Sequence, residues 1–269
     1  MVGKIRIVLA LAVIVVSTLI LAPLQFFAMK TGLWPETFIL KIWHRAMLRG
    51  LGIRVRAVGS LSEQRPLLVA ANHISWTDIM VLGSLVDVKF IAKSELEGWP
   101  LLGALSKLQR TVFIERERKR KSGDQASEIA TRLGKGDAMV LFAEGSTGDG
   151  NTLLPFKSTL FGAASMAIAE GAAEEVSIQP VAIAYTRLHG VAFGRWDRRI
   201  SAWIGDQDLW PHLKALLAQG GLDAEVHFGE PVVFAKGSHR KETARLVERR
   251  VHVMMQLALR DPMGARATK

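Results

Sequence analysis

The pattern of apolar and polar positions along the chain changes near residue 53. Before this point the apolar residues form one long run and then recur at helical spacing. Beyond it, short runs rich in β-branched residues, which are typical of strands, alternate with stretches of helical period. The pattern therefore predicts a helical anchor over residues 1–52 and an α/β domain over residues 53–269.

Seven apolar runs after residue 52 predict strands. They are IRVRAV (53–58), PLLVAAN (66–72), VKFIAK (88–93), TVFIER (111–116), AMVLFAE (138–144), IQPVAIAY (178–185) and EVHFGEPVVF (225–234). The stretches between these runs predict helices at residues 76–86, 99–108, 120–134 and 158–171. Because strands that alternate with helices build parallel sheets, we expect a largely parallel sheet flanked by helices. Ligand sites are then expected in the loops at the carboxyl ends of the strands.

The first segment is apolar enough to enter a membrane. It has no charged residue from Ile7 to Ala22, and the largely apolar stretch reaches Met29, about 23 residues in all, which is long enough to span a bilayer. A cleaved signal peptide is the alternative, but the run is longer than the apolar core of such peptides and no convincing cleavage site follows it. We therefore expect a retained anchor. Basic residues on both sides leave its orientation open.

The next segment, WPETFILKIWHRAMLRG (34–50), predicts an amphipathic helix. Its apolar side combines Phe38, Ile39, Ile42, Trp43, Ala46 and Met47, and its basic side combines Lys41, Arg45 and Arg49. Such a helix lies at a membrane interface or packs on the globular domain with a solvated basic face. Periodicity does not separate these two alternatives.

Composition narrows the chemistry. A hydrophobic content of 49% provides a sizeable core, and the absence of cysteine excludes disulfides, thiolate nucleophiles and Cys-based metal sites. The net charge of +10 suits an anionic partner such as a membrane surface, a nucleic acid or a phosphorylated substrate. The apolar first segment favours the membrane among these, and we expect no nucleic-acid partner.

The stretch NHISWTD (72–78) lies where a predicted strand ends and a helix begins. Ser75 and Asp78 match a capping box, in which Ser75 caps the helix and Asp78 is stabilised in its first turn. The turn can also fold His73 back onto Asp78, which fixes the imidazole tautomer and leaves the other ring nitrogen free as a base. The sequence leaves a structural pair and a catalytic dyad both open.

The stretch LFAEGSTGDGNTLLPFK (141–157) is a second strand end followed by a Gly-rich loop. Its glycines permit a positive φ and its backbone N–H groups can hold an anion, although a merely flexible loop has the same composition. A serine-hydrolase elbow around Ser146 would need glycine where Glu144 stands, which disfavours that class. No dinucleotide or phosphate-loop motif fits here.

Several blocks occur in the order typical of one enzyme family. His73 and Asp78 resemble an H-x-x-x-x-D motif, VFIER (112–116) is similar to an F-I-x-R block, and Glu144 with Gly145 begins an E-G-T block. QPVAI (179–183) resembles the apolar-Pro-apolar block. In this arrangement the chain resembles the 1-acylglycerol-3-phosphate acyltransferase family over roughly residues 65 to 190.

The resemblance assigns roles to these residues. It implies that His73 deprotonates an acceptor hydroxyl for attack on an acyl thioester and that Asp78 orients the imidazole. It also implies a substrate-binding set of Arg116, Glu144, Gly145, Ser146 and Lys157, and neither a metal nor a cofactor. The co-substrate would be acyl carrier protein or coenzyme A carrying the acyl thioester. Taken without the resemblance, Arg116 is one charge of the cluster ERERKRK (115–121), which is typical of a solvated turn.

One departure bears on the acceptor. The family usually reads E-G-T-R, whereas this chain reads E-G-S-T, so Thr147 stands in place of a cation suited to phosphate. The stretches FAEGSTGDGNTLLPFKSTLFGAA (142–164) and AWIGDQDLWPHL (202–213) resemble the lyso-ornithine lipid O-acyltransferase branch. That resemblance implies ornithine lipid synthesis from membrane lipids at a bacterial inner membrane, with the catalytic domain facing the cytoplasm. Lysophosphatidic acid as the acceptor and a non-catalytic lipid-binding protein stay open, as does the oligomeric state.

Overall fold

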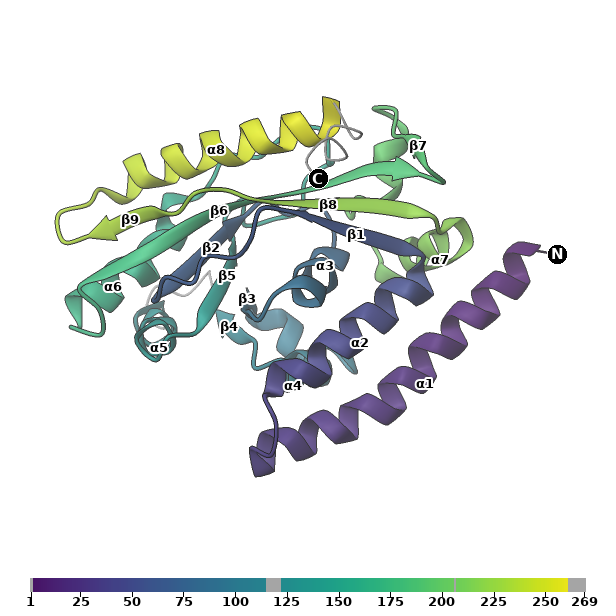
Figure 1. Ribbon diagram of the computed structural model, residues 1–269, viewed down its shortest axis with the longest axis horizontal. Helices are drawn as coiled ribbons and strands as arrows, with labels where there is room; N and C mark the ends of the chain where they lie inside the picture. The colour runs from purple at the N-terminus through teal and green to yellow at the C-terminus, as the bar shows by residue number, and fades with distance from the viewer. Residues whose placement is uncertain (1, 115–121, 206, 261–269) are drawn as a thin grey trace.

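The computed structural model describes residues 2–114, 122–205 and 207–260, and these form one mixed sheet with helices on both faces (Figure 1). The strands are β1 (Ile53–Val58), β2 (Leu67–Ala71), β3 (Lys89–Lys93), β4 (Val112–Ile114), β5 (Ala138–Phe142), β6 (Glu175–Leu188), β7 (Val191–Ala192), β8 (Leu222–Phe228) and β9 (Val232–Ala235). The α-helices are α1 (Val2–Thr31), α2 (Glu36–Leu51), α3 (Thr77–Leu85), α4 (Leu102–Leu108), α5 (Ser122–Gly134), α6 (Gly162–Ala169), α7 (Leu209–Gln219) and α8 (Arg240–Arg260). Three 3₁₀ helices complete the described part: η1 (Ser94–Gly98), η2 (Ser158–Phe161) and η3 (Asp197–Ile200).

The expected largely parallel sheet is confirmed. Its strand order is β1-β8-β6-β2-β5-β3-β4, with β7 and β9 also paired to β6. Parallel pairing joins β1 to β8, β2 to β5 and β6, and β3 to β4 and β5. The antiparallel pairs all involve β6, which meets β7, β8 and β9. The parallel part places the carboxyl ends of β2 and β5 at the same edge of the sheet.

The single strand expected over residues 225–234 is wrong. It is divided into β8 and β9, which both run antiparallel to β6. Between them Gly229 donates its N–H to the carbonyl of Pro180 over 2.9 Å, and Pro231 has no N–H to donate. Because proline removes a ladder hydrogen bond, the strand is interrupted at this point.

Alternation along the central strands divides the core between the two faces of the sheet. In β5, Ala138, Val140 and Phe142 pack in one cluster, while Met139 and Leu141 pack in the other. The first cluster is covered by α2, α3 and α7, and the second by α5, α6 and α8. Since both faces are covered, β2 and β5 are apolar throughout, as expected for strands buried in a sheet. Helices α7 and α8 lie outside the helices that the sequence pattern predicted.

Helix α1 is long and apolar enough to cross a membrane, and almost none of its most apolar stretch is buried. It is nevertheless held against the domain by polar contacts. Trp43 Nε1 donates to Thr18 Oγ1 over 2.9 Å, and Gln25 Nε2 donates to the carbonyl of Leu108 over 3.1 Å. The guanidinium of Arg6 donates to the carbonyl of Leu217. The domain boundary at residues 52 and 53 stays a prediction.

Of the two alternatives for the second helix, packing on the domain is what the structure shows. The side of α2 that is buried carries Ile39, Leu40, Met47 and Leu48. The apolar side expected from the sequence is therefore rotated, because Phe38 and Ile42 stay 57% and 38% exposed. Those two side chains are exposed apolar residues of α2, a helix that runs beside α1 (Figure 1).

Candidate active site

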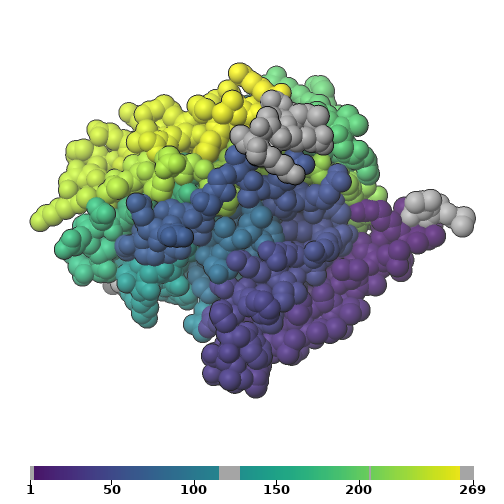
Figure 2. Space-filling view, in the orientation of Figure 1, coloured from purple at the N-terminus to yellow at the C-terminus, as the bar shows by residue number. Residues whose placement is uncertain are grey.

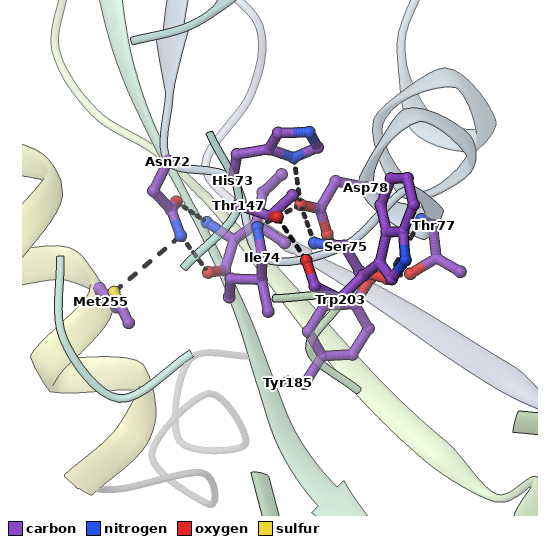
Figure 3. Close-up of polar contacts among 11 residues, drawn as sticks. Asn72, His73, Ile74, Ser75, Thr77, Asp78, Thr147, Tyr185, Trp203 and Met255 are labelled. Atoms are coloured by element: carbon purple, nitrogen blue, oxygen red, sulfur yellow. Dashed lines mark hydrogen bonds and ion pairs between the residues drawn. The ribbon is translucent and has the colours of Figure 1, made fainter. Parts of the chain in front are cut away.

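A histidine–aspartate pair forms where β2 ends and α3 begins. His73 Nδ1 lies 2.9 Å from Asp78 Oδ2, and the Asp78 side chain is fully buried (Figure 3). The His73 side chain keeps 18% of its surface exposed, and its Nε2 has no hydrogen-bond partner among the described residues. A carboxylate on one ring nitrogen and an open second nitrogen is the arrangement of a general base. The geometry expected for the dyad is present.

Asp78 also determines the shape of the loop. Its Oδ2 accepts the backbone N–H of Ile74 over 2.7 Å and that of Ser75 over 2.9 Å. The expected capping contacts are present, since Ser75 Oγ accepts the N–H of Thr77 over 3.4 Å and Asp78 reaches back to the N–H of Ser75. Trp76, between them, already has helical backbone angles. The same carboxylate therefore binds both the turn and the imidazole, so its structural role is compatible with the catalytic dyad, which stays a prediction.

Tyr185 on β6 contacts the histidine–aspartate pair, and the sequence did not single it out. Its hydroxyl donates to Asp78 Oδ1 over 2.9 Å and also contacts Thr77 Oγ1. Burial, together with the adjacent Asp78 charge, raises the pKa of Tyr185 well above its ordinary value. The phenol therefore stays protonated and acts as a fixed donor to the carboxylate.

Replacing Tyr185 with phenylalanine tests this contact. The change leaves Asp78 Oδ1 buried without its donor, so we expect a loss of roughly 1–3 kcal/mol in the free energy of unfolding. Denaturant unfolding at neutral pH measures it. Unchanged stability would show that water or a shifted side chain replaces the phenol. Because this is the only tyrosine in the chain, no other phenol complicates the comparison.

Two further contacts fix the imidazole and the strand end. The His73 ring stacks on Phe142, with ring centroids 3.9 Å apart and planes 13° from parallel. Asn72 exchanges two hydrogen bonds with the backbone of Ile183: its Nδ2 donates over 2.9 Å and its Oδ1 accepts over 2.7 Å (Figure 3). The amide thus holds the end of β2 to β6, directly before the catalytic loop begins.

Glu144 lies at the end of β5 and faces the same loop. It is buried, and its Oε2 has no hydrogen-bond partner among the described residues. Burial raises the pKa of Glu144 to about 8, and the Asp78 charge adds to this, although hydrogen bonds to the backbone of His73 and Leu154 oppose it. At neutral pH the carboxyl is therefore largely protonated and can donate a hydrogen bond.

The Gly-rich loop uses the conformations that its glycines allow. Gly145 has φ 75° and Gly150 has φ 73°. Gly148 donates its N–H to the carbonyl of His73 over 2.8 Å, and a Cβ at that position would lie 3.3 Å from Glu144 Oε2. The loop is therefore bonded to the H-x-x-x-x-D turn, which favours an ordered loop over the flexible alternative.

The remaining predicted substrate-binding residues make no side-chain contact with the His73–Asp78 pair among the described residues. The side chains of Ser146 and Lys157 are exposed, and Lys157 contacts the site through its backbone, donating its N–H to Ala143 over 2.8 Å. No histidine of the described chain contacts the Ser146 hydroxyl, so a serine-hydrolase pair is absent there. Arg116 lies outside the described residues. Within these residues no group of three or more acidic or histidine side chains is placed to hold a metal ion.

A segment between β7 and α7 joins the two loops. The backbone carbonyl of Trp203 accepts a hydrogen bond from the Thr147 hydroxyl. The backbone N–H of Trp203 donates to the carbonyl of Ile74 over 2.9 Å (Figure 3). Trp76 Nε1 donates to His212 Nδ1 over 2.9 Å. Thr147, the departure noted in the sequence, therefore binds protein backbone. The only signal for this segment was the unusual stretch 202–213, since neither periodicity nor spacing predicts these long-range contacts.

Comparison with known proteins agrees with this geometry. The Acyltransferase family model matches residues 52–184. Lyso-ornithine lipid O-acyltransferase of Brucella abortus (strain 2308) is 51% identical over 259 residues, covering 96% of this chain and 97% of that protein. The protein of the same name in Rhizobium meliloti (strain 1021) is 44% identical and covers 97% of this chain and 89% of its own length.

The fold has a match among solved structures. The crystal structure of the 1-acyl-sn-glycerophosphate (LPA) acyltransferase PlsC from Thermotoga maritima superposes with a TM-score of 0.64, over 95% of this chain and 97% of that one. At 20% identity this likeness concerns the fold. The extent and identity of the sequence matches decide the family: the chain belongs to the acyltransferase family and is an acyltransferase.

Proposed function

We propose that the protein transfers a fatty acyl group from an acyl thioester to the hydroxyl of lyso-ornithine lipid. The observation that carries the chemistry is the open Nε2 of His73 opposite a buried Asp78. Two relatives that match almost the whole chain bear the name lyso-ornithine lipid O-acyltransferase, and this supports the acceptor.

The steps use groups of this site. His73 Nε2 takes the proton of the acceptor hydroxyl as the oxygen attacks the thioester carbonyl, and Asp78 stabilises the imidazolium that forms. The tetrahedral intermediate collapses by breaking the C–S bond, and the imidazolium returns the proton to the departing thiolate. The products are an ester and a free thiol. The thioester is a co-substrate, and these steps use no further cofactor.

Recognition of the acceptor falls to the second loop. Glu144, as a neutral carboxyl, and Gly145 would contact the headgroup, with Ser146 and Lys157 at the rim. Arg116, which lies outside the described residues, is carried over from the resemblance as a further contact. Thr147 is neutral and offers no cation to a phosphate, and its hydroxyl is already bonded to the carbonyl of Trp203. This contact supports an acceptor without phosphate over lysophosphatidic acid.

The proposed location is a bacterial inner membrane with the catalytic domain on the cytoplasmic side. The apolar surface of α1 supports membrane association. The lyso-lipid would enter from the bilayer and the thioester from water.

The test supplies membranes containing the protein with labelled acyl-acyl carrier protein and, in parallel, lyso-ornithine lipid or lysophosphatidic acid. We expect labelled ornithine lipid with wild type and none with His73→Ala. His239→Ala, which changes an exposed histidine before α8, is the control and should keep wild-type activity. Labelled phosphatidic acid alone would refute the acceptor, and ester formation by His73→Ala would refute the base.

A further inference from the structure

The face of α8 that points away from the sheet carries a stripe of basic side chains. Lys241, Arg245, Arg249 and His252 follow one another at intervals of three or four residues, and all are exposed. Residues at this spacing lie on one side of a helix, so the four side chains form a continuous row. We call these four residues the basic stripe.

The charge of the stripe is not neutralised within the described chain. The ammonium of Lys241 and the guanidinium groups of Arg245 and Arg249 have no ion-pair partner among the described residues. Glu248 points toward the Gly-rich loop, where its carboxylate accepts the N–H of Phe156 over 2.7 Å. A helix face that is merely solvated commonly alternates the two signs of charge. This one stays predominantly cationic, with Glu242 as the exposed acidic neighbour.

Two apolar side chains border the stripe. Val253 and Leu257 follow it on the outer surface of α8 and are 55% and 59% exposed. A cationic row beside apolar side chains suits a protein surface that presents both carboxylates and apolar groups. From Lys241 to His252 the row is about 16 Å long. This length suits an extended partner surface better than the phosphate groups of one small molecule.

The position of α8 relates the stripe to the active site. The inner face of α8 places Met255 Sδ 4.0 Å from Asn72 Nδ2, next to the catalytic histidine, and Glu248 holds the end of the Gly-rich loop. Helix α1 lies on the opposite side of the molecule (Figures 1 and 2). When the apolar surface of α1 faces a bilayer, the stripe therefore faces water.

We propose that the basic stripe docks an acidic acyl carrier protein that delivers the thioester to the site. This inference rests on the proposed function, which requires a thioester donor, and it identifies the partner by charge. Carboxylates of the carrier pair with the stripe, and its apolar side chains cover Val253 and Leu257. Opposite charges on the two exposed surfaces mainly increase the association rate. Because salt screens these charges, we expect binding to weaken as salt is added.

The test measures binding without turnover. The full chain in detergent micelles is passed over immobilised holo-acyl carrier protein, and we expect Lys241→Glu/Arg245→Glu/Arg249→Glu to bind about tenfold more weakly than wild type at low salt. The matched control, Arg56→Glu/Lys135→Glu/Lys214→Glu, changes three exposed basic residues elsewhere by the same charge and should bind like wild type. The glutamine triple at the stripe positions, which preserves helix propensity, should give an intermediate loss.

Other outcomes overturn the proposal. Equal binding by the stripe and control variants, or no binding by wild type, would refute the proposal that the basic stripe is a docking surface. Loss of binding to phosphatidylglycerol vesicles with carrier binding intact would place the stripe on the membrane instead. In turnover, we expect a higher KM for the acyl carrier protein substrate and an unchanged rate with acyl-N-acetylcysteamine. An inactive wild type that binds the carrier through the stripe would refute the proposed function alone.

Discussion

Asp78→Asn is expected to lower kcat by about a thousandfold or more. The amide oxygen can take the place of Oδ2 and keep the N–H groups of Ile74 and Ser75, and the amide nitrogen can face Tyr185. What disappears is the negative charge that stabilises the imidazolium of His73 when it accepts the proton. The fold should therefore survive while the transfer step fails.

Single-turnover rates with labelled thioester measure this effect, with circular dichroism as a check on the fold. The control is Asp87→Asn, which makes the same chemical change just beyond the end of α3, where Asp87 is largely exposed and paired with Lys41. It should leave kcat unchanged. An Asp78→Asn variant with wild-type kcat would show that the carboxylate is a structural group of the turn and that His73 works without it.

Glu144→Gln is expected to remove a large pH dependence of stability. The pKa of Glu144 is raised from 4.5 to about 8 in the folded chain. Between these values the folded state holds a proton that the unfolded state has lost. Wild-type stability therefore falls as pH rises from about 4.5 to about 8, with a contribution from this group on the order of 5 kcal/mol. Glutamine keeps the size and cannot ionise, so its contribution is independent of pH.

The measurement is denaturant unfolding of both proteins at several pH values across this window. The difference between wild type and Glu144→Gln isolates the group, because the other titrating residues are shared. We expect the variant to gain stability relative to wild type as pH rises. Glu175→Gln, at an exposed position at the start of β6, should follow the wild-type curve. A constant difference between wild type and Glu144→Gln would show that the carboxyl is ionised throughout.

The sequence predicted those parts of the fold that depend on local pattern. The first strand after the anchor begins and ends at the residues expected, Ile53 and Val58. The strand expected over residues 178–185 is longer, from Glu175 to Leu188, because it pairs with β2 on one edge and with β8 and β9 on the other. The buried side of α2 was misjudged, since its partner surfaces on α1 and α3 were unknown.

In the candidate site, too, the sequence predicted the local contacts and missed the long-range ones. His73 and Asp78 are five residues apart, so the turn between a strand and a helix sufficed to predict their contact. Tyr185 and Asp78 are separated by more than a hundred residues and meet only because β6 pairs with β2. The burial of Glu144 likewise depends on a loop that folds over it. No periodicity encodes such contacts, which arise from the tertiary arrangement.

The contacts of α1 fix the orientation of the domain relative to this helix. Arg6 holds one end of this helix to α7, and Gln25 holds the other end to α4. The domain is therefore attached to α1 at both ends of the helix and does not move freely relative to it. In the proposed membrane location, the tilt of the domain relative to the lipid is set when the chain folds, and a longer loop between α1 and α2 would not change it.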